Sequence, residues 1–224
     1  MKSARILWLS MLLTSQLPCA AAELDAVAPP KLPNIDHVRP TLKESPVSNV
    51  LLGTLAIKLE STSLDDILNA AGSGDINHMG DAGGSQYWIC YTLPFNDESE
   101  RIWFSSGELG GPDNKIDSFY AVIDEKVKSS TSCPELPARL RPASLSNGVG
   151  LGAASDMLDR RLGKPSAKIG GWRFYSYTGP TSGLWIDPVT GKSRKKEFEE
   201  LGILGVRIRD GKIVGLFESQ TTSD

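Results

Sequence analysis

Residues 80–85 read GDAGGS, a glycine-rich stretch of the kind that presents a serine nucleophile in some hydrolases. That chemistry needs a serine, a histidine base and a carboxylate that orients the histidine. Ala82 stands where the serine is required. The chain has two histidines: His37 lies far upstream, and His78 lies in the same loop rather than on a distant strand. We therefore interpret the glycines as a flexible connection and expect no protease activity.

The same loop carries potential metal ligands. Asp75, Asn77, His78 and Asp81 place polar side chains at closely spaced positions, as calcium loops do. The distal bidentate glutamate of a full calcium loop is missing, and Asp and Asn are also common turn residues. The sequence therefore predicts no metal site here.

A second group of acidic residues raises the possibility of glycoside hydrolysis, which needs two carboxylates across a cleft. The group consists of Glu108, Asp113, Asp117, Asp124 and Glu125. Nothing in their spacing brings two of them together, and turn residues separate them. We predict no catalytic residue and no cofactor, and a carboxylate-dependent envelope hydrolase stays as an alternative.

The first 22 residues have the pattern of a secretory signal peptide. A basic start is followed by an apolar run over residues 6–17, too short to span a membrane, and then by small residues up to Ala22. We expect cleavage after Ala22 and a periplasmic or secreted protein. Cys19 suggests lipidation as an alternative, but Pro18 precedes it where a small residue is needed.

The chain that remains after this cleavage carries 22 Lys and Arg against 27 Asp and Glu, a net charge of about −5. This charge argues against a nucleic-acid partner, because affinity for phosphates comes mainly from Lys and Arg. No later segment approaches the 18 apolar residues of a membrane span. Cys90 and Cys133 remain, and in an exported chain they are predicted to form one disulfide, with two free buried thiols as the alternative.

Two similar patterns of a helix followed by strands recur along the chain, and these elements would position a functional site. Apolar residues recur with helical spacing over residues 63–72 and 154–163, and Gly72 and Gly163 follow as stop signals. Each predicted helix leads to an aromatic strand with the pattern W-x-x-Y, whose Trp and Tyr should point to opposite faces. Alternating strands follow, with a strong two-residue turn signal at residues 210–211.

These patterns predict an α+β fold with two related units, each with short helices packed on one face of an antiparallel sheet. The expected organisation has five parts: a signal peptide (1–22), a flexible Pro-rich leader (23–48), a first unit (49–123), a linker (124–148) and a second unit (149–224).

The stretches LDRRLGKPS, GGWRFYSY and RIRDGKIVGLFES together resemble the small accessory lipoprotein of the outer-membrane barrel-assembly machine. A tandem pair of such units is similar to the architecture of the β-lactamase inhibitor protein. The resemblance covers about 60 residues of the second half and, more loosely, about 75 of the first. It implies helices on one face of an antiparallel sheet and a binding role in the cell envelope rather than an enzymatic one.

The predicted binding surface is an open sheet face with the composition of an interface hot spot. It comprises Tyr91, Trp103, Tyr175, Tyr177, Arg207 and Arg209. Burial of these side chains between the two halves or in the core is the alternative. We therefore expect an exported module that binds another protein, as an inhibitor or immunity protein acting on a toxin or hydrolase. An envelope-assembly or scaffold protein is the main alternative.

Overall fold

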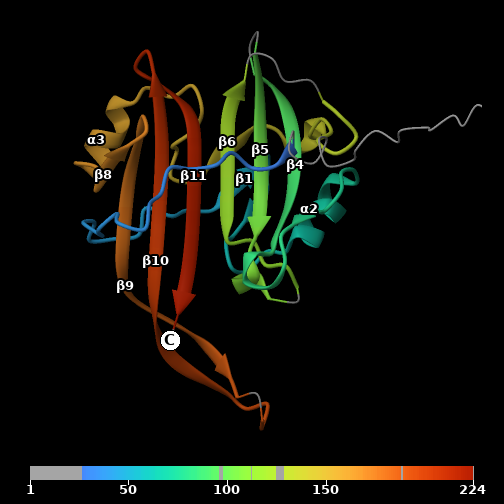
Figure 1. Cartoon of the computed structure of the whole chain (residues 1–224), viewed down its shortest axis with the longest axis vertical. Coiled ribbons are helices and arrows are strands. Elements are labelled where there is room, and N and C mark those ends of the chain that lie inside the picture. The colour runs from blue at the N-terminus through green and yellow to red at the C-terminus, as the bar shows by residue number, and fades with distance from the viewer. Residues whose placement is uncertain (1–26, 96–97, 112, 125–128, 188, 224) are drawn as a thin grey trace, which may run out of the picture.

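The protein is described by a computed structural model that covers residues 27–95, 98–111, 113–124, 129–187 and 189–223 (Figure 1). The predicted signal peptide, its cleavage site and Glu125 lie outside the described residues. None of the helices in the described part is long and apolar enough to cross a membrane.

Eight strands form one antiparallel sheet in the order β3-β4-β5-β6-β11-β10-β9-β8. They are β3 (Asn77–Met79), β4 (Gln86–Phe95), β5 (Glu98–Ser106), β6 (Ser118–Asp124), β8 (Ala167–Ile169), β9 (Trp172–Ile186), β10 (Ser193–Arg209) and β11 (Lys212–Ser223). The centre of this sheet is the pairing of β6 with β11, where Ala121 lies opposite Leu216. The first and second halves of the chain therefore share one continuous sheet (Figure 1).

A second, small antiparallel sheet has the order β2-β1-β7 and lies behind the large one in the view of Figure 1. Its strands are β1 (Val50–Leu52), β2 (Leu55–Ile57) and β7 (Ala143–Leu145). Two α-helices, α2 (Leu64–Ala71) and α3 (Asp156–Leu162), and the short 3-10 helices η1 (Ala82–Gly84), η2 (Glu108–Gly110) and η3 (Ala138–Leu140) complete the described elements. The small sheet and both α-helices bury their apolar residues in the same core on this side of the large sheet.

The first helix is defined by its ends. Ser63 accepts a hydrogen bond from the Asp66 backbone, and the Asp66 carboxylate accepts one from the Ser63 backbone, which together form a capping box. These bonds hold the pKa of Asp66 below its ordinary value. Gly72 ends the helix in the left-handed conformation (φ 73°). The helix predicted over residues 63–72 is confirmed.

The large sheet separates two hydrophobic clusters, and the W-x-x-Y strands contribute to both. Tyr91 and Tyr175 lie in the helix-side cluster, whereas Trp88 and Trp172 lie in the cluster on the opposite face. The opposite orientation of Trp and Tyr that the strand period predicts is confirmed. The turn at residues 210–211 also forms as predicted, because Arg209 pairs with Lys212 across it.

The predicted fold class is wrong. The described residues are mostly strand, in two antiparallel sheets, and they do not form two α+β units with a sheet each. Sequence periodicity identified the helices at 64–71 and 156–162 but not how far the strands extend or that β6 pairs with β11. Because that pairing joins residues about 95 positions apart, no local pattern announces it.

Residues 27–48, which we call the strap, belong to the segment predicted as a flexible leader. Val27, Leu32, Ile35 and Val38 pack against the cluster on the outer face of the large sheet. In Figure 1 this blue segment crosses in front of the strands. The backbone amides of Thr41 and Leu42 then donate to the Ser176 carbonyl on β9, at 3.0 and 3.1 Å.

Beyond that point the strap passes to the helix side. Val47 packs against the helix-side core, and the Ser48 amide donates to Glu218 Oε1 at 2.8 Å. The strap therefore wraps around the β9 edge of the sheet and contacts both of its faces.

Candidate functional site: the β9–β10 arm

The residues predicted to form an open sheet face do not lie on one exposed surface. Tyr91 and Tyr175 are completely buried in the helix-side core. The Tyr91 hydroxyl donates to the Ser73 carbonyl at 2.8 Å, and burial raises the pKa of Tyr91 to about 12. Tyr177 is half-buried, and its ring lies across the backbone of Gly179. These tyrosines hold the fold together and leave little surface for a partner.

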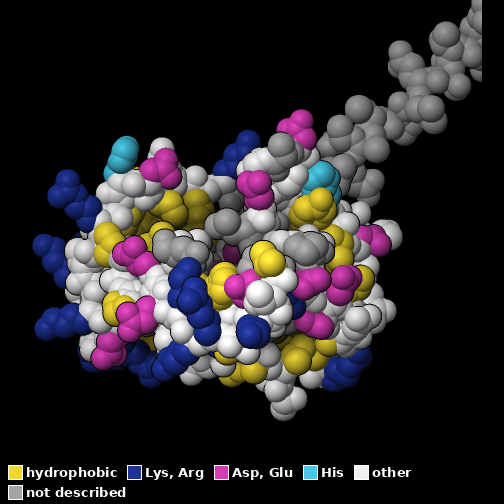
Figure 2. Space-filling view, turned by 90° about the horizontal axis from the view of Figure 1, so that it is seen from below, with side chains coloured by type: hydrophobic (Ala, Val, Ile, Leu, Met, Phe, Trp, Pro, Cys, Tyr) yellow, Lys and Arg dark blue, Asp and Glu magenta, His cyan; other side chains and the backbone are white. Residues whose placement is uncertain are grey.

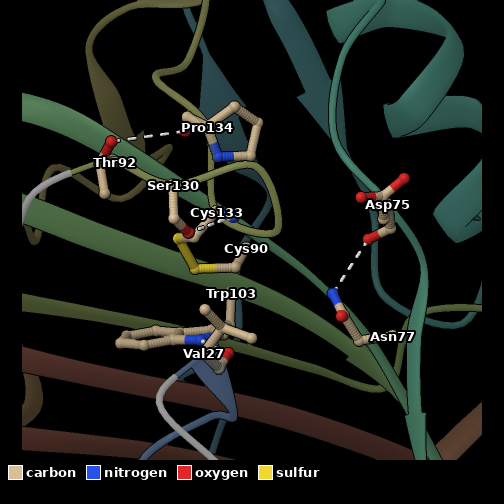
Figure 3. The surroundings of a disulfide bond; sticks show 9 residues. All are labelled: Val27, Asp75, Asn77, Cys90, Thr92, Trp103, Ser130, Cys133 and Pro134. Atoms are coloured by element: carbon tan, nitrogen blue, oxygen red, sulfur yellow. Dashed lines mark hydrogen bonds between the residues drawn. A yellow bond between two sulfur atoms is a disulfide. The ribbon is translucent and has the colours of Figure 1, made fainter. Parts of the chain in front are cut away.

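Trp103 faces the other side of the sheet, where the strap covers it. It is 3% exposed, and its Nε1 donates to the Val27 carbonyl at 2.8 Å (Figure 3). Arg207 and Arg209 are exposed, and Arg209 pairs with Glu98 at 3.2 Å. No sequence pattern indicated that the strap covers this face, because its apolar residues are scattered among prolines.

The predicted disulfide between Cys90 and Cys133 is confirmed. Both residues are buried in the outer cluster, next to Trp103 and Val27 (Figure 3). The bond ties the connection between residues 124 and 148 to β4. Backbone hydrogen bonds from Thr92 to Pro134 and from Leu136 to Thr92 reinforce this attachment.

The glycine-rich loop is a compact structural connection. A side chain at Gly80 would collide with the Gly84 carbonyl, because a Cβ there would lie 2.2 Å from that oxygen. His78 stacks on Tyr87 with a centroid distance of 4.3 Å, and Asn77 donates to the Asp75 carbonyl. No three His, Cys, Asp or Glu side chains in the described ranges gather in a way that could hold a metal ion.

Asp117, one of the candidate carboxylates, and its neighbour Glu60 are both used internally. Asp117 accepts hydrogen bonds from the Gly107 amide at 2.6 Å and from Ser118 Oγ at 2.7 Å. Burial raises its pKa in spite of these bonds. Glu60, which lies near Asp117, accepts from the Thr222 amide at 2.6 Å and from its hydroxyl. Both carboxylates thus anchor loops to the sheet, as structural residues do.

The largest exposed feature is a two-stranded arm, residues 181–198, that projects from the body (Figure 1). The pairing of β10 with β11 ends at Glu199, and the pairing of β9 with β8 ends at Phe174. Along the arm, β9 and β10 therefore pair only with each other within the described residues. Asp187 closes the turn by accepting from the Val189 and Thr190 amides, and these bonds lower its pKa.

Exposed apolar side chains are concentrated on this hairpin. Among the described residues five large hydrophobic side chains are exposed, and four belong to β9, β10 or their turn: Leu184 (70%), Ile186 (60%), Val189 (91%) and Leu201 (38%). Basic residues at positions 192 and 194–196 accompany them. Figure 2, which views the molecule from the arm end, shows basic and hydrophobic side chains side by side.

The two faces of the arm differ in character. On the face continuous with the helix-side core, Arg194 lies 4.7 Å from the Trp185 ring centre, and Lys196 lies between Trp185 and Phe198. The Phe198 ring packs over Gly183, which has no side chain to displace it. An isolated two-stranded ribbon is marginal in water, so these cation–π and ring–glycine contacts stiffen the arm.

The opposite face of the arm is simpler. Leu184 lies beside Lys195, and Ile186 lies beside Ser193, in direct cross-strand pairs. Neither apolar side chain is covered, as their exposure shows. We call this face the contact face. It presents the branched apolar side chains of Leu184 and Ile186 on β9 and the cation of Lys195 on β10.

A cleft of about 510 Å³ separates the arm base from the body. Leu184 and Phe198 line its arm side, and the body side contributes the cations Lys58 and Lys115 and the acidic residues Glu60 and Asp117. The cleft therefore joins the apolar side chains of the arm to a body surface of mixed charge.

The mixed charges of residues 192–200 are typical of a solvated segment between strands. Two signals could have identified the arm. Leu184, Trp185 and Ile186 form a short apolar run next to a turn, and Phe198 interrupts the charged run that follows. No protein-family model, no curated protein and no solved structure matches this chain.

Proposed function

We propose that the protein is an exported protein-binding module and that the β9–β10 arm is its contact element. The observation that carries this proposal is the concentration of exposed apolar side chains on a projecting hairpin. The proposal keeps the expected role of binding another protein in the periplasm or outside the cell. It moves the contact surface from the sheet face, which the strap covers, to the arm.

The composition of the arm supports a protein partner. Exposed apolar residues grouped on one element, with Trp and Arg beside them, are typical of interaction surfaces. Covering Leu184 and Ile186 would contribute roughly 1–2 kcal/mol each. Cations at positions 192 and 194–196, on a chain with excess acidic residues, favour a partner whose surface is acidic around an apolar centre.

An inhibitor or immunity protein fits this geometry, because a stiff projecting hairpin can enter the cleft of a toxin or hydrolase. A scaffold or envelope-assembly protein would use the same arm to hold a structural partner. The alternative of a carboxylate-dependent hydrolase gains no support from Asp117, because internal hydrogen bonds occupy its carboxylate.

The test compares capture of envelope and secreted proteins by the full chain and by two variants. Leu184→Ser/Ile186→Ser removes the apolar residues of the contact face. Met79→Ser is the matched control, because Met79 is 46% exposed on β3 at the other end of the sheet. We expect one dominant partner that the double variant loses and Met79→Ser retains.

Retention of that partner by the double variant would contradict the proposal. If the partner is an enzyme, loss of its activity on addition of the protein supports an inhibitor. Unchanged activity, with co-purification of outer-membrane components, supports a scaffold.

A further inference from the structure

A second site lies on the helix side of the first half, away from the arm. A cavity of about 290 Å³ opens between β4, β5 and the segment around β7. Its walls are mainly apolar and include Leu93, Pro94, Pro142 and Leu151. The lining also includes two charged residues, Glu100 and Arg141.

Glu100 is the unusual member of this wall. It is 5% exposed, and within the described residues its carboxylate has no hydrogen-bond or ion-pair partner. Burial without a compensating partner raises its pKa to about 7. An unpaired buried carboxylate is costly, and proteins normally satisfy such groups.

The other buried acid of the sheet has a partner for one of its oxygens. Glu218 is completely buried, its Oε1 accepts the Ser48 amide of the strap at 2.8 Å, and its Oε2 has no hydrogen-bond partner among the described residues. Glu218 therefore has a structural task, and no cavity adjoins it among those described. The carboxylate of Glu100, in contrast, lines a cavity and has no partner within the described residues.

Arg141 does not satisfy Glu100. Its Nε donates to the Leu136 carbonyl at 2.6 Å, and its terminal nitrogen pairs with Glu135. The guanidinium is thus committed to the connection that carries the disulfide. The one unpaired charge in the cavity wall is negative.

We infer that this cavity is a binding pocket for a primary alkylammonium group, with Glu100 accepting the ammonium and the apolar walls contacting the alkyl chain. The size of the cavity suits a chain of about four carbons, as in a lysine side chain or a small free amine. A charge-assisted hydrogen bond in a water-poor pocket is among the stronger polar contacts. This inference does not depend on the proposed role of the arm.

The test titrates the full chain with n-butylammonium at pH 8 and follows binding by NMR shifts of residues around the pocket. n-Butanol and butyrate are matched ligands with the same chain and no positive charge. We expect n-butylammonium to bind at least tenfold more tightly than either. Equal binding of n-butanol would overturn the inference, because the pocket would then recognise only the alkyl chain.

Two variants separate Glu100 from general surface charge. Glu100→Gln keeps the shape of the side chain and should lose at least tenfold in affinity for n-butylammonium. Glu98→Gln removes a half-buried carboxylate, which pairs with Arg209 outside the pocket, from the same strand and should leave binding unchanged. Unchanged affinity in Glu100→Gln would overturn the inference, and so would a failure of the native chain to bind.

The source of the ammonium group is distinguished by a third ligand, N-acetyl-lysine methylamide. If it binds as tightly as n-butylammonium, the pocket accepts a lysine side chain of a protein. If only n-butylammonium binds, the pocket accepts a small free amine. Both outcomes support the inference.

Discussion

The indole Nε1 of Trp103 donates a hydrogen bond to the carbonyl oxygen of Val27, 76 residues earlier in the chain, at 2.8 Å. This bond fixes the start of the strap to the outer face of the sheet. It also accounts for the burial of Trp103, a residue type that is common in protein interfaces. The polar end of the indole, which could have contacted a partner, is already occupied within the chain.

Trp103→Phe tests the strap contact, because it keeps an aromatic ring and removes the donor. We expect a loss of about 1 kcal/mol in the free energy of unfolding, since the Val27 carbonyl would lose its partner. Urea unfolding followed by circular dichroism measures the change. An unchanged midpoint would show that the strap does not contribute through this bond.

The disulfide should contribute strongly to stability. Cys90→Ala/Cys133→Ala opens a loop of about 44 residues and should lower the free energy of unfolding by up to roughly 4 kcal/mol. Chemical denaturation of the variant and of the reduced native chain should give similar losses. A variant as stable as the oxidised protein would contradict this prediction.

Stability should fall as the pH rises from about 5 to 8. Burial raises the pKa of Glu100 to about 7 and that of Glu218 to about 8, from an ordinary value of 4.5. Between these values the folded chain keeps protons that the unfolded chain releases. Each group therefore lowers the free energy of unfolding by up to about 1.4 kcal/mol per pH unit in its window.

Glu218→Gln isolates the larger of these two effects. The variant should lose much of the dependence between pH 5 and 8, because the amide does not titrate. Glu44→Gln, at an exposed position of the strap, should keep the dependence of the native chain. Urea unfolding at a series of pH values measures both, and an identical pH dependence in Glu218→Gln would contradict the assignment.

Gly183→Val should disorder the arm and leave the body intact. A Cβ at this position would lie 3.2 Å from the Phe198 ring, so the ring and the cations stacked near it must shift. We expect faster amide hydrogen exchange over residues 181–198 and a global stability within about 0.5 kcal/mol of the native chain. Gly191→Ala, at the exposed turn, is not a suitable control because Gly191 has φ 68°. Val189→Ala serves instead.

Local signals predicted several parts of the fold. The 3.6-residue period and the Gly72 stop signal predicted the first helix, and the two-residue strand period separated Trp88 from Tyr91. The presence of two cysteines in a chain that we expect to be exported predicted the disulfide. Each of these features is determined by residues close in sequence or by a rule of composition.

The parts that were not predicted depend on distant contacts. The strap has apolar residues without a period, and only the complementary cluster around Trp103 shows where they pack. The arm consists of residues that alternate weakly, and only the ends of β8 and β11 show that it stands alone. The burial of three predicted binding residues also depends on distant contacts, because the strap covers Trp103 and the helix-side core encloses Tyr91 and Tyr175.

The pairing of β6 with β11 also constrains the order in which the chain can fold. Ala121 and Leu216 meet at the centre of the sheet, about 95 residues apart, and β11 follows every other strand of the described residues. Until β11 is in place, β6 has an unpaired edge and the sheet cannot be completed. Loop closure over this distance is slow compared with hairpin formation, so the hairpins should form first and the two halves of the sheet should join last.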